Sequence, residues 1–188
     1  YPRGYYADYR TFIRMKEEMG RLQNQSYMLY TEYKRPVKEF FWTLMLSHFN
    51  SRRDYLTQTD YQGEEFKLTS LKHRHRIEQY QARSIVSKGI YDWNLKASLE
   101  AIYNYGKGVQ AGQGIVQPYE SHWLSLKPKV DWTPTHWLST SYQAEIDGNR
   151  TSSLPTLWSI RQRLSLGIGN DTWNMNLKGI AVHSRSRV

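Results

Sequence analysis

The sequence predicts an all-β chain, an antiparallel transmembrane β-barrel of about eight long strands. Three observations predict this fold. Apolar and polar residues alternate over long stretches, short connections alternate with long ones, and Trp and Tyr gather near the expected strand ends. We expect one barrel segment over 1–188, with 1–22 irregular or loop and 23–188 a meander of antiparallel strands.

The clearest strand runs from Asp92 to Tyr105, where the odd positions are apolar or aromatic and the even positions are mostly polar. A period of two places these sets on opposite faces of a strand, whereas a helix would scatter both. Pro128 falls within another alternating stretch and argues against a central paired strand unless a bulge lies there. Helical spacing occurs only at Phe12, Met15, Met19 and Leu22. The further predicted strands cover 27–34, 38–48, 77–87, 120–132, 136–146, 157–168 and 172–183.

The connections fall into two classes. Short turns rich in Pro, Gly, Asn or Asp are predicted at 36–37, 87–91, 133–135 and 169–171. Long polar loops are predicted at 50–75, 106–119 and 147–155. Short turns on one side and long loops on the other are typical of outer-membrane barrels.

The aromatic residues give a second indication, because Trp and Tyr prefer the boundary between membrane and water. We expect a girdle at both strand ends, formed by Trp93, Trp132, Trp173, Tyr103, Tyr105 and Trp158.

The polar positions of the alternating strands carry mixed charges, as expected for side chains that face a barrel lumen. The predicted lumen-facing residues are Arg83, Lys96, Glu100, Lys127, Lys129, Arg161, Arg163 and Lys178.

Composition excludes several classes of protein. The chain has 188 residues, with 26 Lys plus Arg against 17 Asp plus Glu, a formal charge of +9. Its 15 Tyr, 7 Trp and 5 Phe argue against disorder, and no apolar run approaches the roughly 18 residues of a membrane helix. Without cysteine it has neither disulfides nor Cys-ligated metals. The basic residues are spread over nearly every strand, so we expect no nucleic-acid partner.

Three clusters are candidates for chemical sites. The segment Lys72–Arg76 fits a solvated basic loop or a patch facing lipopolysaccharide, with an anion contact or a metal site as alternatives. The glycines of Gly106–Gly114 precede a strand, so we expect a mobile loop and not a phosphate loop. The carboxylates of Glu100, Asp131, Glu145 and Asp147 fit lumen charges better than a glycosidase pair. No catalytic, cofactor-binding or metal-binding residue is therefore predicted, and we expect no enzyme.

One family resemblance follows from the strand end Tyr30–Pro36, the segment Phe40–Leu44 and the long hairpins over 77–185. Together they resemble the C-terminal barrel of TonB-dependent outer-membrane receptors of the Bacteroidota type. The resemblance implies a barrel of about 22 strands around an N-terminal plug, placed in the outer membrane of a Gram-negative cell. It implies uptake of a nutrient such as a siderophore, oligosaccharide or peptide.

No plug is recognised in the sequence, so we expect the chain to form a section of the barrel wall. The implied partners are outer-membrane lipid and lipopolysaccharide, TonB through the plug, and a surface lipoprotein. Two alternatives stay open. One is a small self-contained outer-membrane barrel with an adhesion or structural role, and the other is a soluble carbohydrate-binding β-sandwich.

Overall fold

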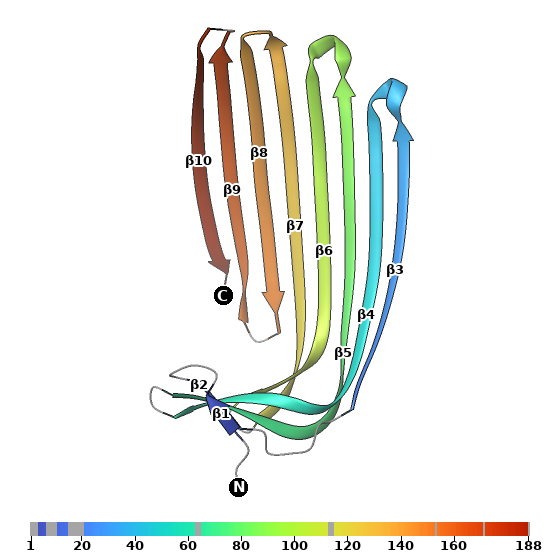
Figure 1. The fold of residues 1–188 in the computed structure, drawn as a ribbon, viewed down its shortest axis with the longest axis vertical. Coiled ribbons are helices and arrows are strands. Elements are labelled where there is room, and N and C mark those ends of the chain that lie inside the picture. Colours follow the sequence, from blue (N-terminus) through green and yellow to red (C-terminus); the bar gives the residue numbers. More distant parts are fainter. Residues whose placement is uncertain are drawn as a thin grey trace. The chain divides into compact units, whose positions relative to one another are not determined.

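The computed structural model describes residues 4–6, 11–14, 21–62, 65–112, 115–152, 154–170 and 172–187. These residues form an all-β fold without an α-helix, as the alternation predicts (Figure 1). The strands are β1 (Gly4–Tyr6), β2 (Thr11–Arg14), β3 (Leu22–Arg35), β4 (Phe40–Gln62), β5 (Glu65–Ile90), β6 (Leu95–Gly112), β7 (Ile115–Thr135), β8 (Leu138–Thr151), β9 (Leu154–Gly169) and β10 (Asn174–Arg187). Two short 3-10 turns, η1 (Pro36–Lys38) and η2 (Tyr91–Trp93), connect β3 to β4 and β5 to β6.

The strands pair in one sheet in the order β1-β2-β5-β4-β6-β7-β8-β9-β10, with β3 on β4 and a further pairing of β5 with β6. Among the described residues, β3 pairs only with β4 and β10 only with β9, so the sheet is open. In the same part of the chain, no helix has the length and apolar character needed to cross a membrane.

The chain divides into two compact units. The first unit comprises Tyr1–Tyr27, His48–Tyr80 and Gly106–Glu120. The second unit comprises Met28–Ser47, Gln81–Tyr105 and Ser121–Val188.

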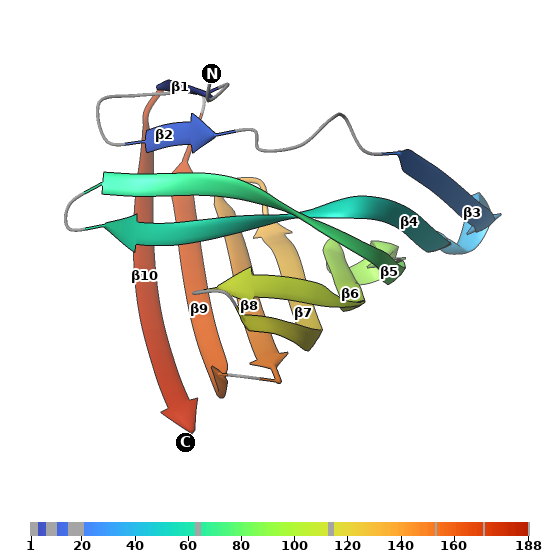
Figure 2. The same ribbon diagram turned by 90° about the horizontal axis from the view of Figure 1, so that it is seen from below.

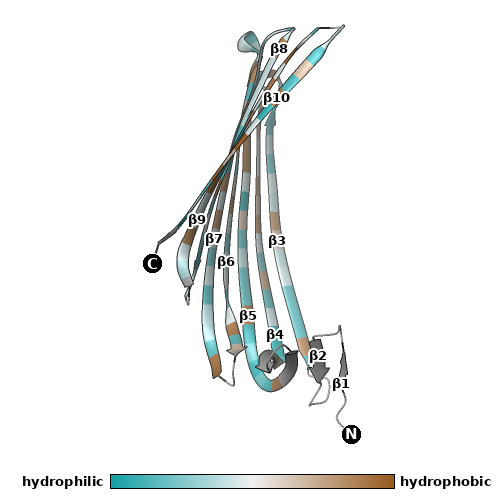
Figure 3. Cartoon of the chain, turned by 90° about the vertical axis from the view of Figure 1, so that its left-hand side faces the viewer, coloured by the Kyte–Doolittle hydropathy of each residue, from teal (hydrophilic) through white to brown (hydrophobic). Residues whose placement is uncertain are grey.

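In the second unit, strands β7 to β10 form an antiparallel meander and lie side by side in both ribbon views (Figures 1 and 2). The register aligns Trp132 with Thr140, Thr140 with Leu166, and Leu166 with Leu177. Directly opposed residues share a face, so the predicted apolar positions of the four strands gather on one face. Figure 3 shows apolar and polar residues following one another along the strands.

The short turns are close to the predicted positions. The turn at Pro36 is confirmed, whereas the next reversal lies at Tyr91–Asn94, later than the predicted 87–91. The third lies at His136 and Trp137, because β7 continues through Thr135. In the fourth, the Asn170 side chain accepts hydrogen bonds from the backbone N–H groups of Thr172 and Trp173, at 3.0 and 3.2 Å. Asp171 lies outside the described residues.

In three of these turns, a backbone carbonyl accepts a hydrogen bond from a backbone N–H of the next hairpin. Glu39 and Asn94, which follow η1 and η2, have positive φ angles of 47° and 46°. The carbonyl of Glu39 accepts a hydrogen bond from the Gly89 N–H (2.9 Å), and that of Asn94 accepts one from the Thr133 N–H (3.0 Å). A third bond joins the Gly169 N–H to the Trp137 carbonyl (2.9 Å). The turns therefore hold neighbouring hairpins together at this end of the second unit.

The prediction of three long loops is wrong. The segment 50–75 lies in β4 and β5 except for residues 63 and 64, which are not described, and 106–119 lies in β6 and β7 except for 113 and 114. The segment 147–155 belongs likewise to β8 and β9 apart from its tip. Polarity suggested loops, but strand pairing uses backbone groups, which polar and Gly-rich segments also supply. The basic segment Lys72–Arg76 is therefore a strand, and the described part of Gly106–Gly114 is too.

Pro128 neither ends β7 nor causes a bulge. Register pairs between β7 and β8 are interrupted at Lys127 and Pro128, and the same register resumes at Lys129 opposite Gln143. The only shift on this ladder falls between Trp132 and Thr135. Pro128 lacks a donor for the ladder, and the flanking pairs hold the strand in place.

The helical spacing near the N-terminus does not produce a helix where the structure is described. Phe12 lies in β2, which pairs in parallel with β5, and Leu22 begins β3. Met15 and Met19 lie outside the described residues. Pairing with β5 therefore overrides the local periodicity at β2.

Candidate functional site

The polar face of the second unit carries a network of ion pairs across adjacent strands. Glu145 on β8 forms ion pairs with a cation on each neighbouring strand. Lys127 Nζ on β7 lies 2.6 Å from Glu145 Oε1, and Arg161 Nη1 on β9 lies 3.4 Å from Glu145 Oε2. On β5 and β6, Arg83 Nη2 lies 2.6 Å from Glu100 Oε1. We call these five residues the charged ladder: Arg83, Glu100, Lys127, Glu145 and Arg161.

The other predicted lumen residues lie on or beside this network. Lys129 pairs with Asp131 on its own strand, Nζ to Oδ2 at 2.7 Å, and Ser141 donates a hydrogen bond to Asp131 at 2.7 Å. The register places Arg163 opposite Gln143 and Lys178 opposite Ser165, on the face that holds Arg161. Lys96 is exposed near the start of β6. The alternation thus brings the predicted charges of β7 to β10 onto one face.

Sequence reasoning placed Glu145 among the polar residues but did not single it out as the centre of a three-residue network. Its two partners lie 18 and 16 positions away along the chain, and only strand register brings them together. Of the four carboxylates considered for an acid and base pair, three are held by cations: Glu100 by Arg83, Asp131 by Lys129, and Glu145 by Lys127 and Arg161. Asp147 Oδ1 is buried and has no hydrogen-bond partner among the described residues.

The opposite face of the second unit is apolar and exposed. Leu164 and Leu177 are 51% and 52% exposed, and Met175 on β10 is also exposed. Among the described residues only Leu56 and Ala144 are buried apolar side chains, so no apolar core has formed.

Two apolar side chains of β10 break this division of the faces. Ile180 and Val182 are exposed and lie opposite Arg163 and Arg161 in the register. These two side chains therefore belong to the polar face.

The residues predicted as aromatic girdles lie at different heights along the strands, and Tyr103 and Tyr105 lie in the middle of β6, because that strand continues to Gly112. Trp93, Trp132 and Trp173 are exposed at or near the short turns. Tyr103 and Tyr105 both contact His122, with Tyr103 Oη 2.8 Å from His122 Nδ1 and a ring separation of 4.9 Å for Tyr105. The Trp158 ring lies against Gly148 on the neighbouring strand.

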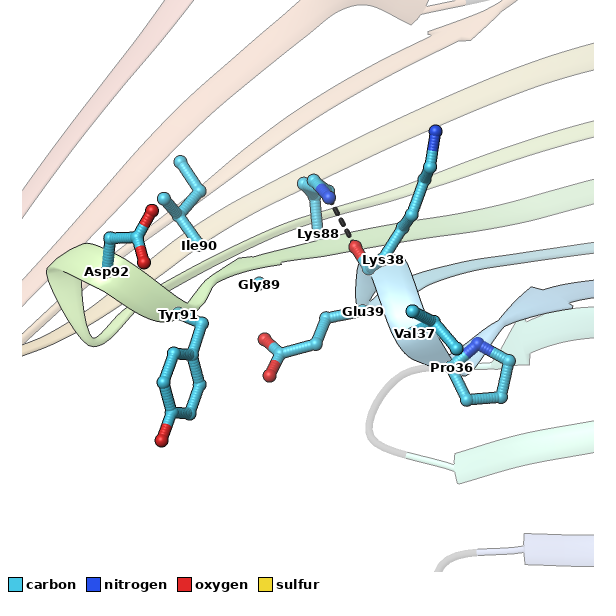
Figure 4. Close-up of a pocket in the computed structure, with 9 residues that line it drawn as sticks. All are labelled: Pro36, Val37, Lys38, Glu39, Lys88, Gly89, Ile90, Tyr91 and Asp92. Atoms are coloured by element: carbon cyan, nitrogen blue, oxygen red, sulfur yellow. Dashed lines mark hydrogen bonds between the residues drawn. The ribbon is translucent and has the colours of Figure 1, made fainter.

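A shallow pocket lies between the first two turns (Figure 4). The Lys88 ammonium donates a hydrogen bond to the Lys38 carbonyl, and the Glu39 side chain reaches over Gly89. No arrangement of a nucleophile with a base occurs among the residues that line this pocket. The lining residues are Pro36, Val37, Lys38, Glu39, Lys88, Gly89, Ile90, Tyr91 and Asp92.

The first unit contains a second polar cluster that the sequence did not predict. Glu78 on β5 is 6% exposed and bridges two cations, with Arg76 Nε 2.7 Å from Oε1 and Lys107 Nζ 2.8 Å from Oε2. Arg76 Nε also donates to Asn50 Oδ1 at 2.8 Å. Hydrogen bonding from Lys107, helped by the charges of Arg76, Lys107 and His48, lowers the pKa of Glu78 against the opposing effect of burial. Glu78 is therefore a carboxylate at neutral pH.

An aromatic stack lies on the same strands. The His48 ring on β4 stacks on Tyr80 of β5, with centroids 4.5 Å apart and an interplanar angle of 18°. Tyr27 of β3 stacks on the His48 ring at 6.1 Å and 8°. The rings of His73 and His75, which belong to the basic segment Lys72–Arg76, also stack, with centroids 6.1 Å apart. Among the described residues, however, no group of three or more potential metal ligands occurs.

No protein-family model, curated protein or solved structure matches the chain.

Proposed function

We propose that the chain forms part of the wall of a transmembrane β-barrel in the outer membrane and serves nutrient uptake in a TonB-dependent receptor. The observation that carries this proposal is the contrast between the two faces of the β7–β10 meander. One face presents exposed apolar rows, and the other presents an ion-paired network. A sheet between lipid and a water-filled lumen needs this division.

The strand lengths support the same proposal. A membrane strand needs about 9–11 residues, and the shortest strands of the meander have 14 residues. At about 3.3 Å per residue, 14 residues extend about 46 Å, or about 35 Å at a tilt near 40°. Each strand therefore exceeds the roughly 30 Å hydrocarbon core.

The open edges require further strands under this proposal. Unpaired backbone groups are costly in hydrocarbon, which contains no water to bond them. Strands β3 and β10 would therefore pair with other strands of a larger barrel, and closure would satisfy both edges.

The charged ladder would then line the lumen. Its carboxylates are engaged by cations, which favours a polar transport surface over acid–base catalysis. The proposed partners are outer-membrane lipid and lipopolysaccharide, TonB through a plug, and a surface lipoprotein. We propose no cofactor and no enzymatic reaction.

The test uses the absence of cysteine, which makes single cysteine labels unambiguous. Leu177→Cys and Lys178→Cys are neighbours on opposite faces of β10. In the intact protein, reconstituted in bilayers, a fluorophore at 177 should be quenched by lipid-borne nitroxide and one at 178 by aqueous iodide. Quenching of both labels by iodide alone would contradict a membrane wall. Shielding of 177 from both quenchers, with partition into buffer without detergent, would favour the β-sandwich.

A further inference from the structure

The strongest unassigned feature is the fixed orientation of Arg76 in the first unit. Its Nε is held by Glu78 at 2.7 Å and by Asn50 at 2.8 Å. Glu78 and Asn50 are 6% and 5% exposed, so both anchors are buried, whereas the Arg76 side chain is 49% exposed. A guanidinium held through Nε keeps its two terminal nitrogens, with about four N–H donors, for other partners.

Those terminal donors form a planar fork. A guanidinium fork matches the spacing of two oxygens in a carboxylate or phosphate and binds them with two parallel hydrogen bonds. Holding the side chain in advance reduces the rotamer entropy that is lost when an anion binds.

The charge around Arg76 favours an anion. Lys72 and Arg74 precede it at alternate positions of β5, so the three cations lie on one face of the strand. Lys107 on β6 shares the Glu78 carboxylate with Arg76. Glu78 offsets one of these positive charges, and the group therefore keeps a positive excess.

We propose that Arg76, positioned by Glu78 and Asn50, is the receptor for a phosphate-type oxyanion. Lys72, Arg74 and Lys107 supply the surrounding positive field. The site uses residues of the first unit only, and so it does not depend on the proposed transport function. A phosphate that carries two negative charges fits better than a single carboxylate, because it offers more acceptor oxygens to several cations. The phosphate can come from a lipid headgroup or from a free anion.

The test measures binding to the full chain in neutral detergent by titration calorimetry with three probes. Inorganic phosphate represents the free anion. Short-chain phosphatidic acid carries a phosphomonoester on a lipid, and short-chain phosphatidylglycerol carries only a phosphodiester. Saturable binding of inorganic phosphate assigns the site to free anions, and binding of phosphatidic acid alone assigns it to lipid phosphate. Binding of none of the three overturns the proposal, and so does equal binding of both lipids without phosphate binding.

Two charge-conserving variants provide the decisive comparison. Arg76→Lys keeps the charge and removes the fork, and we expect about a tenfold or greater loss of affinity, the effect of one charge-assisted hydrogen bond. Arg74→Lys is the matched control two residues along the same face and should bind within about twofold of the original chain. Equal losses in the two variants would show only diffuse attraction to basic residues and would overturn the site.

Glu78→Gln tests the positioning role. Removing a negative charge strengthens anion binding if only net charge matters. If Glu78 positions Arg76, the same variant weakens binding while its circular dichroism stays that of the original chain. Tighter binding would contradict the positioning role. Glu78 is buried, and a substitution there can prevent folding. If Glu78→Gln does not fold, Arg76→Lys still tests the site, because the Arg76 side chain is exposed.

Discussion

The Trp158 ring on β9 occupies the space that a side chain would need at Gly148 on β8. The two residues are directly opposed in the register, and a Cβ at Gly148 would lie 2.7 Å from the Trp158 ring. A large aromatic ring covering a strand glycine compensates for the packing that the glycine lacks. Trp158, predicted from the sequence as a girdle residue, therefore also has a specific partner on the next strand.

This relationship predicts that Gly148→Ala destabilises the sheet. The added methyl group displaces the indole ring, and we expect a loss of about 1–3 kcal/mol in the free energy of unfolding, as for overpacked sites. Gly179→Ala on β10 is the matched control, because a Cβ there meets nothing within 4 Å. Denaturant titration of both variants measures the difference, and similar losses would contradict the packing role of Trp158.

A charge on the apolar face should cost more than one on the neighbouring position. Leu99 is 44% exposed on β6, and Ser98 precedes it on the opposite face. If this face meets lipid, Leu99→Arg in the intact protein should cost about 2–4 kcal/mol, the range for a charge near the bilayer midplane. Ser98→Arg should be much milder. Equal effects in equilibrium unfolding from bilayers would count against the assignment of the faces.

The charged ladder should show unequal coupling on its two sides. Lys127 lies 2.6 Å from Glu145, and both side chains are partly buried, whereas Arg161 lies 3.4 Å away and is more exposed. Double-mutant cycles with alanine should give about 0.5–1 kcal/mol for Lys127 with Glu145 and less for Arg161 with Glu145. Stronger coupling to Arg161 would mean that β9, not β7, holds Glu145.

The lowered pKa of Glu78 predicts an acid-sensitive first unit. The folded state binds this proton less tightly than the unfolded chain does, so the stabilisation is present above the ordinary Glu pKa. It is lost as the pH falls through that value toward the lowered one. The protection factors of β5 amides near Glu78, which compare each exchange rate with that of an unfolded chain at the same pH, should fall over this range in the original chain. In Glu78→Gln the fall should be smaller, and an identical pH profile of protection in both would contradict the prediction.

Period-two alternation was sufficient to predict the strands of the second unit and the faces of their side chains. Leu164 and Arg163 are neighbours in sequence, and the pleat alone places them on opposite sides. The same rule failed as a guide to strand ends. The segments 50–75 and 106–119 are too polar to predict as strands, but the first belongs to the paired strands β4 and β5 and the second to the paired strands β6 and β7.

The all-β class, the approximate turns and the two faces of the strands could therefore be predicted from the residues alone, because these features depend on periodicity and on residues such as Pro36 and Asn170 that act locally. The partners of the charged side chains could not be predicted in this way. Glu145 lies between Lys127 and Arg161, and Glu78 lies between Arg76 and Lys107, through strand register. A shift of one residue would move each side chain to the other face, and the backbone pairing of distant segments sets that register.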